Sequence, residues 1–145
     1  MKKNKKAFTL IEIMITVVLI GIIATFAIPN YSKAIAKARE RDAIIQLSAI
    51  HAAAEFYKAR VGSYYSADLA TAVAINNALK TNIIPNNITY SYAFISLSKS
   101  FEVTANCGTF SVKILSGPLG QGISSNNNPC CVGTNCPSYP SLFQC

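Results

Sequence analysis

The stretch KKAFTLIEIMITVVLIGIIATFAIPNY, residues 5–31, decides the architecture of the N-terminal part of the chain. Sixteen of the 21 positions from 8 to 28 are apolar. At a rise of about 1.5 Å per residue, this segment forms a helix about 30 Å long, which matches the hydrocarbon layer of a bilayer. It is longer than the apolar core of a secretory signal peptide, which has about 7–15 residues. We therefore predict a membrane-spanning helix.

An acidic residue, Glu12, lies inside this apolar segment. A charged side chain at the centre of a bilayer costs about 2.5–3.5 kcal/mol on insertion scales. The pattern therefore predicts that Glu12 has a specific partner, because an unpaired carboxylate in lipid is expensive.

The positive charge of the chain is concentrated beside the apolar segment. Four lysines among the first seven residues contribute to a formal net charge of +7, whereas the balance from Val61 onward is only +1. This distribution argues against a specific nucleic-acid site, since such a site requires positive charge on the folded domain. The dense leader charges and the five cysteines, all after residue 106, favour a cytoplasmic N-terminus and an oxidising compartment for the C-terminal part.

Helical features continue beyond Pro29 to Val61, and Gly62 is a suitable C-cap. Residues 43–57 are apolar around much of the predicted helix, so we expect one face to pack on its own domain and another to bind something else. The first apolar stripe consists of Ile35, Ala38, Ile45, Ala49, Ala52 and Phe56, and the second set consists of Ile44, Leu47, Ile50 and Ala54.

Gly21 and Pro29 are the weak points of the long helix. Pro29 has two interpretations: a simple kink where the span ends, or part of a segment that extends or melts when its environment changes. The charged run Arg39–Asp42 also has two interpretations: it is a solvated face, or it is a set of charges that fixes the register between subunits.

Residues 62–145 have the pattern of a small α+β head. Ser66 is the predicted cap of a short helix that ends near Lys80. Residues 88–97, 100–105 and 109–115 read as three strands of an antiparallel meander. Residues 116–145 contain no charged residue and read as a loop-like tail.

The cysteines predict disulfides rather than a metal site, because no CxxC pair occurs and His51 is the sole histidine. Adjacent cysteines form a strained bridge, so Cys130 and Cys131 are expected to have different partners. The favoured pairing joins Cys107 to Cys130 or Cys131, and Cys145 closes back on the tail. The candidates are Cys107, Cys130, Cys131, Cys136 and Cys145.

Catalytic constellations are absent from the sequence, which contains no nucleophile elbow, P-loop or paired carboxylate motif. We therefore expect neither enzymatic activity nor a cofactor. His51 is expected to be a packed or rim residue, and the candidate surface contacts for adhesion are Tyr64, Tyr65 and Tyr139.

The segment Phe8-Thr9-Leu10-Ile11-Glu12, after a short basic leader and a small residue and followed by Pro29 and Tyr31, resembles the N-terminus of type IV pilins and pseudopilins. The resemblance covers about 30 of the 145 residues. It implies that a prepilin peptidase cleaves between Ala7 and Phe8 on the cytoplasmic side and that the new amine of Phe8 is methylated. Ala7 departs from the family pattern, in which glycine usually stands at this position.

The resemblance gives Glu12 two candidate partners. One is the amine of Phe8 in the same chain. The other is the amine of the neighbouring subunit, which the equivalent carboxylate is thought to attract as a filament grows. Gly21, Pro29 and Glu12 are thus the expected assembly residues.

The resemblance implies a type IV pilin-like fold: a long N-terminal helix packed on a small antiparallel sheet, with a cysteine-bearing C-terminal loop. It also implies a pilin that polymerises with identical or related subunits on an inner-membrane assembly platform and serves adhesion, twitching motility or DNA uptake. The expected segments are a leader at 1–7, a membrane or filament-core half-helix at 8–29, an amphipathic half-helix at 30–61, and a head at 62–145 divided into 62–87, 88–115 and 116–145.

Two other functions remain open. One is a pseudopilin of a type II secretion-like system, in a periplasmic filament. The major pseudopilins carry a calcium site built on acidic side chains in the C-terminal loops, and residues 103–145 contain no Asp or Glu. The other is a membrane-anchored or secreted binding module. A signal peptidase that cuts after Ala27 would release a soluble protein beginning at Ile28.

Overall fold

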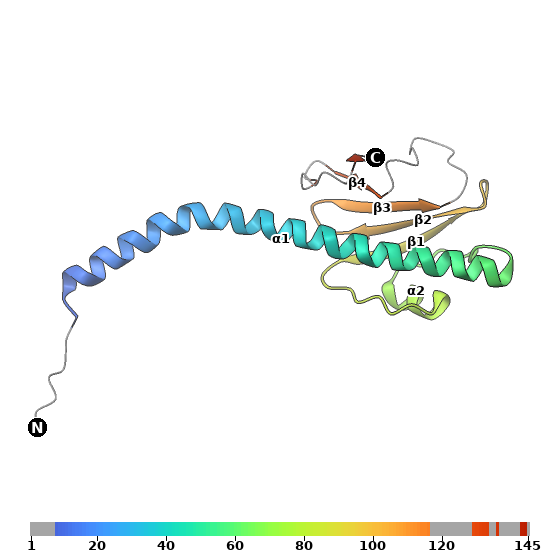
Figure 1. Ribbon diagram of the computed structural model, residues 1–145, viewed down its shortest axis with the longest axis horizontal. Coiled ribbons are helices and arrows are strands. Elements are labelled where there is room, and N and C mark those ends of the chain that lie inside the picture. The colour runs from blue at the N-terminus through green and yellow to red at the C-terminus, as the bar shows by residue number, and fades with distance from the viewer. Residues whose placement is uncertain (1–7, 117–128, 134–135, 137–142, 145) are drawn as a thin grey trace, which may run out of the picture. The chain divides into compact units, whose positions relative to one another are not determined.

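A computed structural model describes residues 8–116, 129–133, 136, 143 and 144, which fall into two compact units, Met1–Ile35 and Ala36–Cys145 (Figure 1). We describe each unit by itself. The elements are α1 (Leu10–Val61), α2 (Ala72–Leu79), β1 (Thr89–Ile95), β2 (Ser100–Asn106), β3 (Ser111–Ser116), β4 (Cys130–Val132) and β5 (Phe143–Gln144).

The N-terminal unit contains the first half of α1, and its described side chains form no apolar core. Every large apolar side chain from Phe8 to Ile28 is at least 52% exposed. An 18-residue window of α1 has a mean hydropathy of 2.6, and none of that window is buried within the structure. Burying one such side chain is worth about 1.5–3 kcal/mol, so this surface is stable only when lipid or other helices cover it.

The two predicted weak points, Gly21 and Pro29, do not interrupt the helix, and α1 is continuous across both of them. Proline removes one backbone donor from a helix but does not require the helix to end. The helix ends as predicted at Gly62, which has a φ of 89° and whose N–H donates to the carbonyl of Lys58 over 2.7 Å. Such a left-handed cap favours glycine because it has no Cβ.

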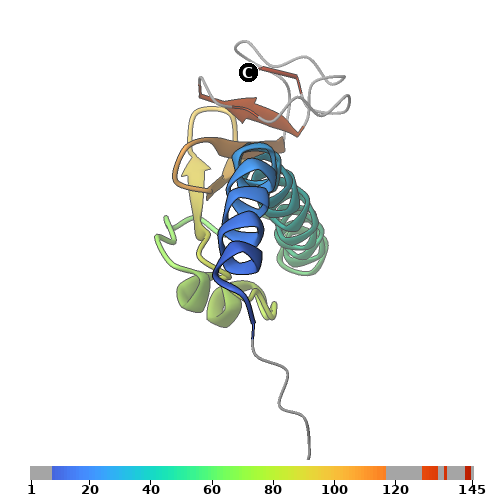
Figure 2. The same cartoon turned by 90° about the vertical axis from the view of Figure 1, so that its left-hand side faces the viewer.

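In the C-terminal unit, α1 packs one face on the sheet, as Figure 2 shows in the view along the helix. Ala43, Leu47, Ile50 and Ala54 follow a 4-3-4 spacing and are 0% exposed. This spacing places them on one side of a helix. The core therefore lies between this face and the sheet.

The sheet has the order β1-β2-β3-β4-β5. The predicted meander of three antiparallel strands is confirmed in β1, β2 and β3. The interpretation of residues 116–145 as a tail without strands was wrong. Three residues of β4 pair antiparallel with β3, and β5 pairs parallel with β4. Strands this short have too few residues for a periodic sequence signal. Pairing with the edge of β3 holds β4 in place, and pairing with β4 holds β5.

Alternate residues of the strands form the core side of the sheet. Tyr90, Ala105, Val112 and Cys131 are partners across four neighbouring strands, and all four are buried. Phe101 is 0% exposed, and its ring lies 5.1 Å from that of Tyr92 and 4.9 Å from that of Tyr64. This is the alternation expected of a sheet with one face on a core.

The short helix begins later than predicted. Its N-cap is Thr71, whose side chain accepts from the N–H of Ala74, and not Ser66. The residues just before it protect the edge of β1 instead. Leu69 exchanges two backbone hydrogen bonds of 2.8 Å with Tyr92, and Asp68 accepts from the N–H of Phe94. Because residues 68–69 pair with β1, they cannot also form the first turn of the helix, and they cover part of an edge that would otherwise be unpaired.

Candidate assembly site

The carboxylate of Glu12 belongs to a capping box at the start of α1. Its Oε2 accepts from both the backbone N–H and the hydroxyl of Thr9, each over 2.8 Å, and the Thr9 hydroxyl accepts from the N–H of Glu12 over 3.3 Å. The spacing Thr-x-x-Glu before an apolar run is the sequence signature of this motif. Thr9 is therefore a partner of Glu12 that our sequence reasoning missed and that this signature would have revealed.

This arrangement leaves one oxygen of Glu12 open. Among the described residues, no donor reaches its Oε1, and the side chain is exposed. The carboxylate also lies in the first turn, where the positive end of the helix dipole favours a negative charge by about 0.3–1 kcal/mol. The site can therefore satisfy the helix N-terminus and still accept a further cation.

The processing residues lie at the edge of the described region. Ala7 lies outside the described residues, and the side chain of Phe8 is 82% exposed. Gly21 has no atom within 4 Å of the position that a Cβ would occupy, so a neighbouring helix can approach its backbone closely.

The first of the two apolar stripes that the sequence predicts on α1 is exposed. In the C-terminal unit it consists of Ala38, Ile45, Ala49, Ala52 and Phe56, which we call the outer stripe. Ile45 and Phe56 are 67% and 71% exposed. A large side chain left in water forfeits most of its transfer free energy, so this stripe is a candidate contact for another molecule.

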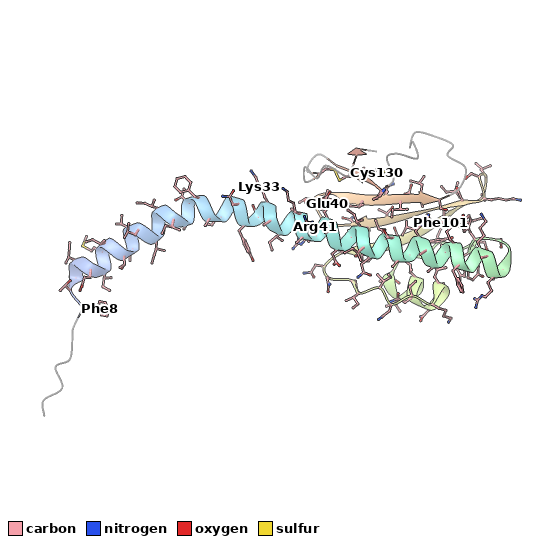
Figure 3. All side chains as sticks on the ribbon, viewed as in Figure 1. Phe8, Lys33, Glu40, Arg41, Phe101 and Cys130 are labelled. Carbon is pink, nitrogen blue, oxygen red and sulfur yellow. A yellow bond between two sulfur atoms is a disulfide. The ribbon has the colours of Figure 1, made fainter. Side chains whose placement is uncertain are left out.

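The charged run Arg39–Asp42 is only partly a solvated face. Arg39 and Arg41 are exposed, but Glu40 is 0% exposed and lies on the sheet side of α1 near its entry into the head (Figure 3). Neither interpretation of the run allowed a buried Glu40. The reason is helical phase, because Glu40 lies three residues before Ala43 and shares the face that packs on the sheet.

The disulfide pattern differs from the favoured prediction. Cys131 pairs with Cys136, while Cys107 is a free, buried thiol. Cys130 is also disulfide-bonded. The predicted closure of Cys145 on the tail lies outside the described residues. The pairing of Cys107 with Cys130 or with Cys131 was wrong, because both lie on β4 and β3 lies between β2 and β4. Two strand spacings are about 9.5 Å, whereas a disulfide needs Cα atoms within about 6.8 Å.

A polar network fixes the far end of α1 to the head. The hydroxyl of Tyr64 donates to Oε1 of Glu55 over 2.7 Å, and the hydroxyl of Ser116 donates to the same oxygen. Burial alone would raise the pKa of Glu55, but the two hydrogen bonds and the charges of His51 and Lys58 lower it below the ordinary value. Tyr64 is therefore a buried structural residue, not the surface contact that we expected.

His51 is a rim residue, as predicted. Its ring lies 5.5 Å from that of Phe101, and its Nε2 lies 3.9 Å from Oε1 of Glu55. It borders an open pocket of about 200 Å³ together with Ser48, Ile114 and Pro129. Within the described part of the chain, no group of three or more His, Cys, Asp or Glu side chains lies close enough to hold a metal ion.

Comparison with known proteins gives a family for the N-terminus. The prokaryotic N-terminal methylation motif matches residues 2–28. A fimbrial protein of Pseudomonas aeruginosa is 47% identical over 53 residues, which are 37% of this chain and 34% of that protein. The type IV major fimbrial protein FimA of Dichelobacter nodosus is 50% identical over 44 residues, which are 30% of this chain and 28% of the relative.

A longer match is to the type II secretion system core protein G of Vibrio cholerae serotype O1. The two are 34% identical over 89 residues, which are 60% of each chain. The chain thus spans between 28% and 60% of the length of these three relatives. No solved structure matches significantly. The methylation motif, these relatives and the long helix packed on an antiparallel sheet together support the resemblance to type IV pilins and pseudopilins.

Proposed function

We propose that this chain is a pilin, the structural subunit of a type IV pilus-like surface filament. The observation that carries the proposal is the unpartnered N-terminal helix, whose large apolar side chains from Phe8 to Ile28 are all at least 52% exposed. Lipid covers such a surface in the membrane precursor, and neighbouring helices replace the lipid in a filament. The similarity to two fimbrial proteins, over 53 and 44 residues, also supports the proposal. The proposed role is structural and involves no cofactor.

The precursor has its N-terminus in the cytoplasm. A prepilin peptidase cleaves it between Ala7 and Phe8, and the new amine of Phe8 is methylated. The basic leader and the methylation motif at residues 2–28 support this processing. Mass spectrometry of the mature N-terminus is the direct test. A methylated Phe8 is the expected result, and a chain that begins at Ile28 or keeps its leader would exclude a filament subunit.

Glu12 recruits the next subunit through its open Oε1. The capping box holds the carboxylate of Glu12 at the start of the helix. Its negative charge still lacks a cationic partner, and the amine of Phe8 in a neighbouring subunit supplies one. Two close opposite charges offset their desolvation, whereas a lone carboxylate in lipid does not. The subunits then polymerise on the inner-membrane assembly platform through their N-terminal helices.

Two variants separate the charge of Glu12 from its capping role. Glu12→Gln keeps a side chain that fits the capping box but removes the charge. Thr9→Ala removes the N-cap hydroxyl, at a cost of about 0.5–2 kcal/mol, and keeps the charge. We expect Glu12→Gln to abolish filaments in the fraction sheared from cells, and Thr9→Ala to retain them. Normal filaments in Glu12→Gln would refute pairing by charge.

The outer stripe forms a second contact between subunits. It extends the contact beyond the membrane segment, because Ile45, Ala49 and Phe56 offer exposed apolar area on the face of α1 that avoids the sheet. Adhesion, twitching motility and DNA uptake are the roles that such a filament serves.

A pseudopilin of a type II secretion-like system is the second candidate. The alignment with the core protein G is the longest of the three described here, at 89 residues. The location of the assembled filament distinguishes the two functions. Long filaments outside the cell support a pilin, and protein that stays in the periplasm while secretion fails on deletion supports a pseudopilin.

A further inference from the structure

Glu40 is a buried acid at the point where α1 first joins the core of the head. Among the residues whose side chains the structure describes, it is the first buried residue along the chain, and it is 0% exposed. Glutamate is almost never fully buried unless it is paired. The burial of Glu40 therefore requires an explanation.

No protein group in the described part of the chain bonds to either carboxylate oxygen of Glu40. An ionised carboxylate in such a place carries a large desolvation penalty, while the neutral acid carries a much smaller one. Burial raises the pKa of Glu40, although the charges of Lys37 and Arg41 act in the opposite direction. Both Lys37 and Arg41 are on exposed positions of α1. Their positive charges therefore stabilise the ionised carboxylate of Glu40 most when that carboxylate has left the core.

The sheet offers Glu40 no positive charge among the described residues. Two titratable groups lie at this end of the core: Cys107, just after β2, and Tyr90 on β1. The hydroxyl of Tyr90 is buried without a hydrogen-bond partner among the described groups. Burial raises the pKa of Cys107 to about 11, with Arg39 opposing and Glu40 and Asp42 adding to the shift. The turn of α1 from 39 to 42 is thus close to the thiol.

We propose that Glu40 is a pH-dependent latch between α1 and the sheet. The protonated side chain packs in the core and keeps the turn that contains Glu40 on the sheet. When the proton passes to solvent, the carboxylate moves out toward Lys37 and Arg41, the turn lifts, and Cys107 becomes accessible. This inference concerns the head alone and does not depend on the proposed filament role.

The sign of the effect follows from linkage. A group whose pKa is higher in the folded state binds its proton more tightly there than in the unfolded state. The stability that it contributes is complete below the ordinary pKa of glutamate and is lost as the pH rises through the folded-state value. The latch is therefore closed in acid and open at higher pH.

The buried thiol reports on the latch directly. The full chain in detergent micelles is reacted with N-ethylmaleimide from pH 5 to pH 8, and mass spectrometry follows the peptide that contains Cys107. The rate for the wild type is divided by the rate for Glu40→Gln at each pH, which cancels the ordinary dependence of thiol reactivity on pH. We expect the ratio to rise about threefold or more across this range.

The direct electrostatic effect of Glu40 has the opposite sign. A negative charge beside Cys107 disfavours the thiolate, so without a latch the wild type would react more slowly than Glu40→Gln as the pH rises. A flat or falling ratio therefore overturns the proposal. Glu102→Gln is the matched control, because Glu102 is a half-buried carboxylate with a partner, Lys113, at 2.7 Å. The rate of Cys107 modification in the wild type, divided by the rate in Glu102→Gln, should not change with pH.

A second variant keeps the test valid if the buried amide of Glu40→Gln unfolds the head. Glu40→Met replaces the acid with an apolar side chain of similar length, which often stabilises a buried site. We expect its melting temperature to fall less than that of the wild type between pH 5 and pH 8. An equal fall in both proteins would overturn the latch.

Discussion

Truncation of Phe101 should strongly destabilise the head, whereas truncation of Phe56 should leave its stability nearly unchanged. Phe101 is 0% exposed, and its ring contacts those of His51, Tyr64 and Tyr92 at centroid distances of 5.5, 4.9 and 5.1 Å. Phe56 is 71% exposed on the outer stripe. The pair therefore compares the same chemical change on a core side chain and on a surface side chain.

The structure sets the magnitude of the difference. A buried Phe→Ala substitution costs about 3–5 kcal/mol, because it loses transfer free energy and leaves a cavity. That is a large part of the roughly 5–15 kcal/mol that stabilises a domain. Since 1 kcal/mol corresponds to about 4–8 °C in a domain of this size, we expect Phe101→Ala to lower the melting temperature by at least about 12 °C. A surface substitution such as Phe56→Ala changes stability by about 0.5 kcal/mol or less.

Thermal denaturation of both variants in detergent, followed by near-UV circular dichroism, measures the stability. The filament fraction sheared from cells measures assembly. We expect Phe56→Ala to retain the melting temperature and lose filaments, since it removes only the contact that we propose between subunits. Equal destabilisation by the two variants would refute the assignment of the two faces of α1.

Two further predictions concern the head. Glu55→Gln should cost roughly 1 kcal/mol at neutral pH, after allowance for the 42% exposure of the side chain. Because the pKa of Glu55 is lowered, its contribution is present above the ordinary value of about 4.3 and is lost as the pH falls below it, so denaturation curves of the two proteins should converge in acid. Replacement of both Cys131 and Cys136 by serine should cost about 2 kcal/mol, because the closed loop is short; a denaturant midpoint equal to that of the wild type would contradict this stabilisation.

Local sequence explains which parts of the fold were predictable. The long helix, its end at Gly62 and the three strands of the meander all follow from patterns of neighbouring residues. The start of α2 was misplaced because both Ser66 and Thr71 are good N-caps. The choice between them rests on the hydrogen bonds that Asp68 and Leu69 make with β1, which is distant in sequence.

Some residues of the candidate site were likewise predictable from local sequence, and others were not. Glu12 stood out as a charge in an apolar segment, and its bonds to Thr9 are local enough that the spacing Thr-x-x-Glu would have predicted them. The role of Cys107 was not predictable, because its distance from Cys131 depends on the strand β3 that lies between them. The pattern showed two apolar faces on α1 but not which of them packs on the head.

The sequence by itself thus determined a membrane-length helix with one acid near its start and a small head of antiparallel strands. These properties depend on composition and on periods of two to four residues, which the chain carries locally. Only the tertiary structure decided that Glu40 is buried, that Cys107 stays unpaired and that the outer stripe faces away from the sheet. Each of these depends on the rotation of α1 against the sheet or on the order of the strands, and contacts between residues far apart in the chain set both.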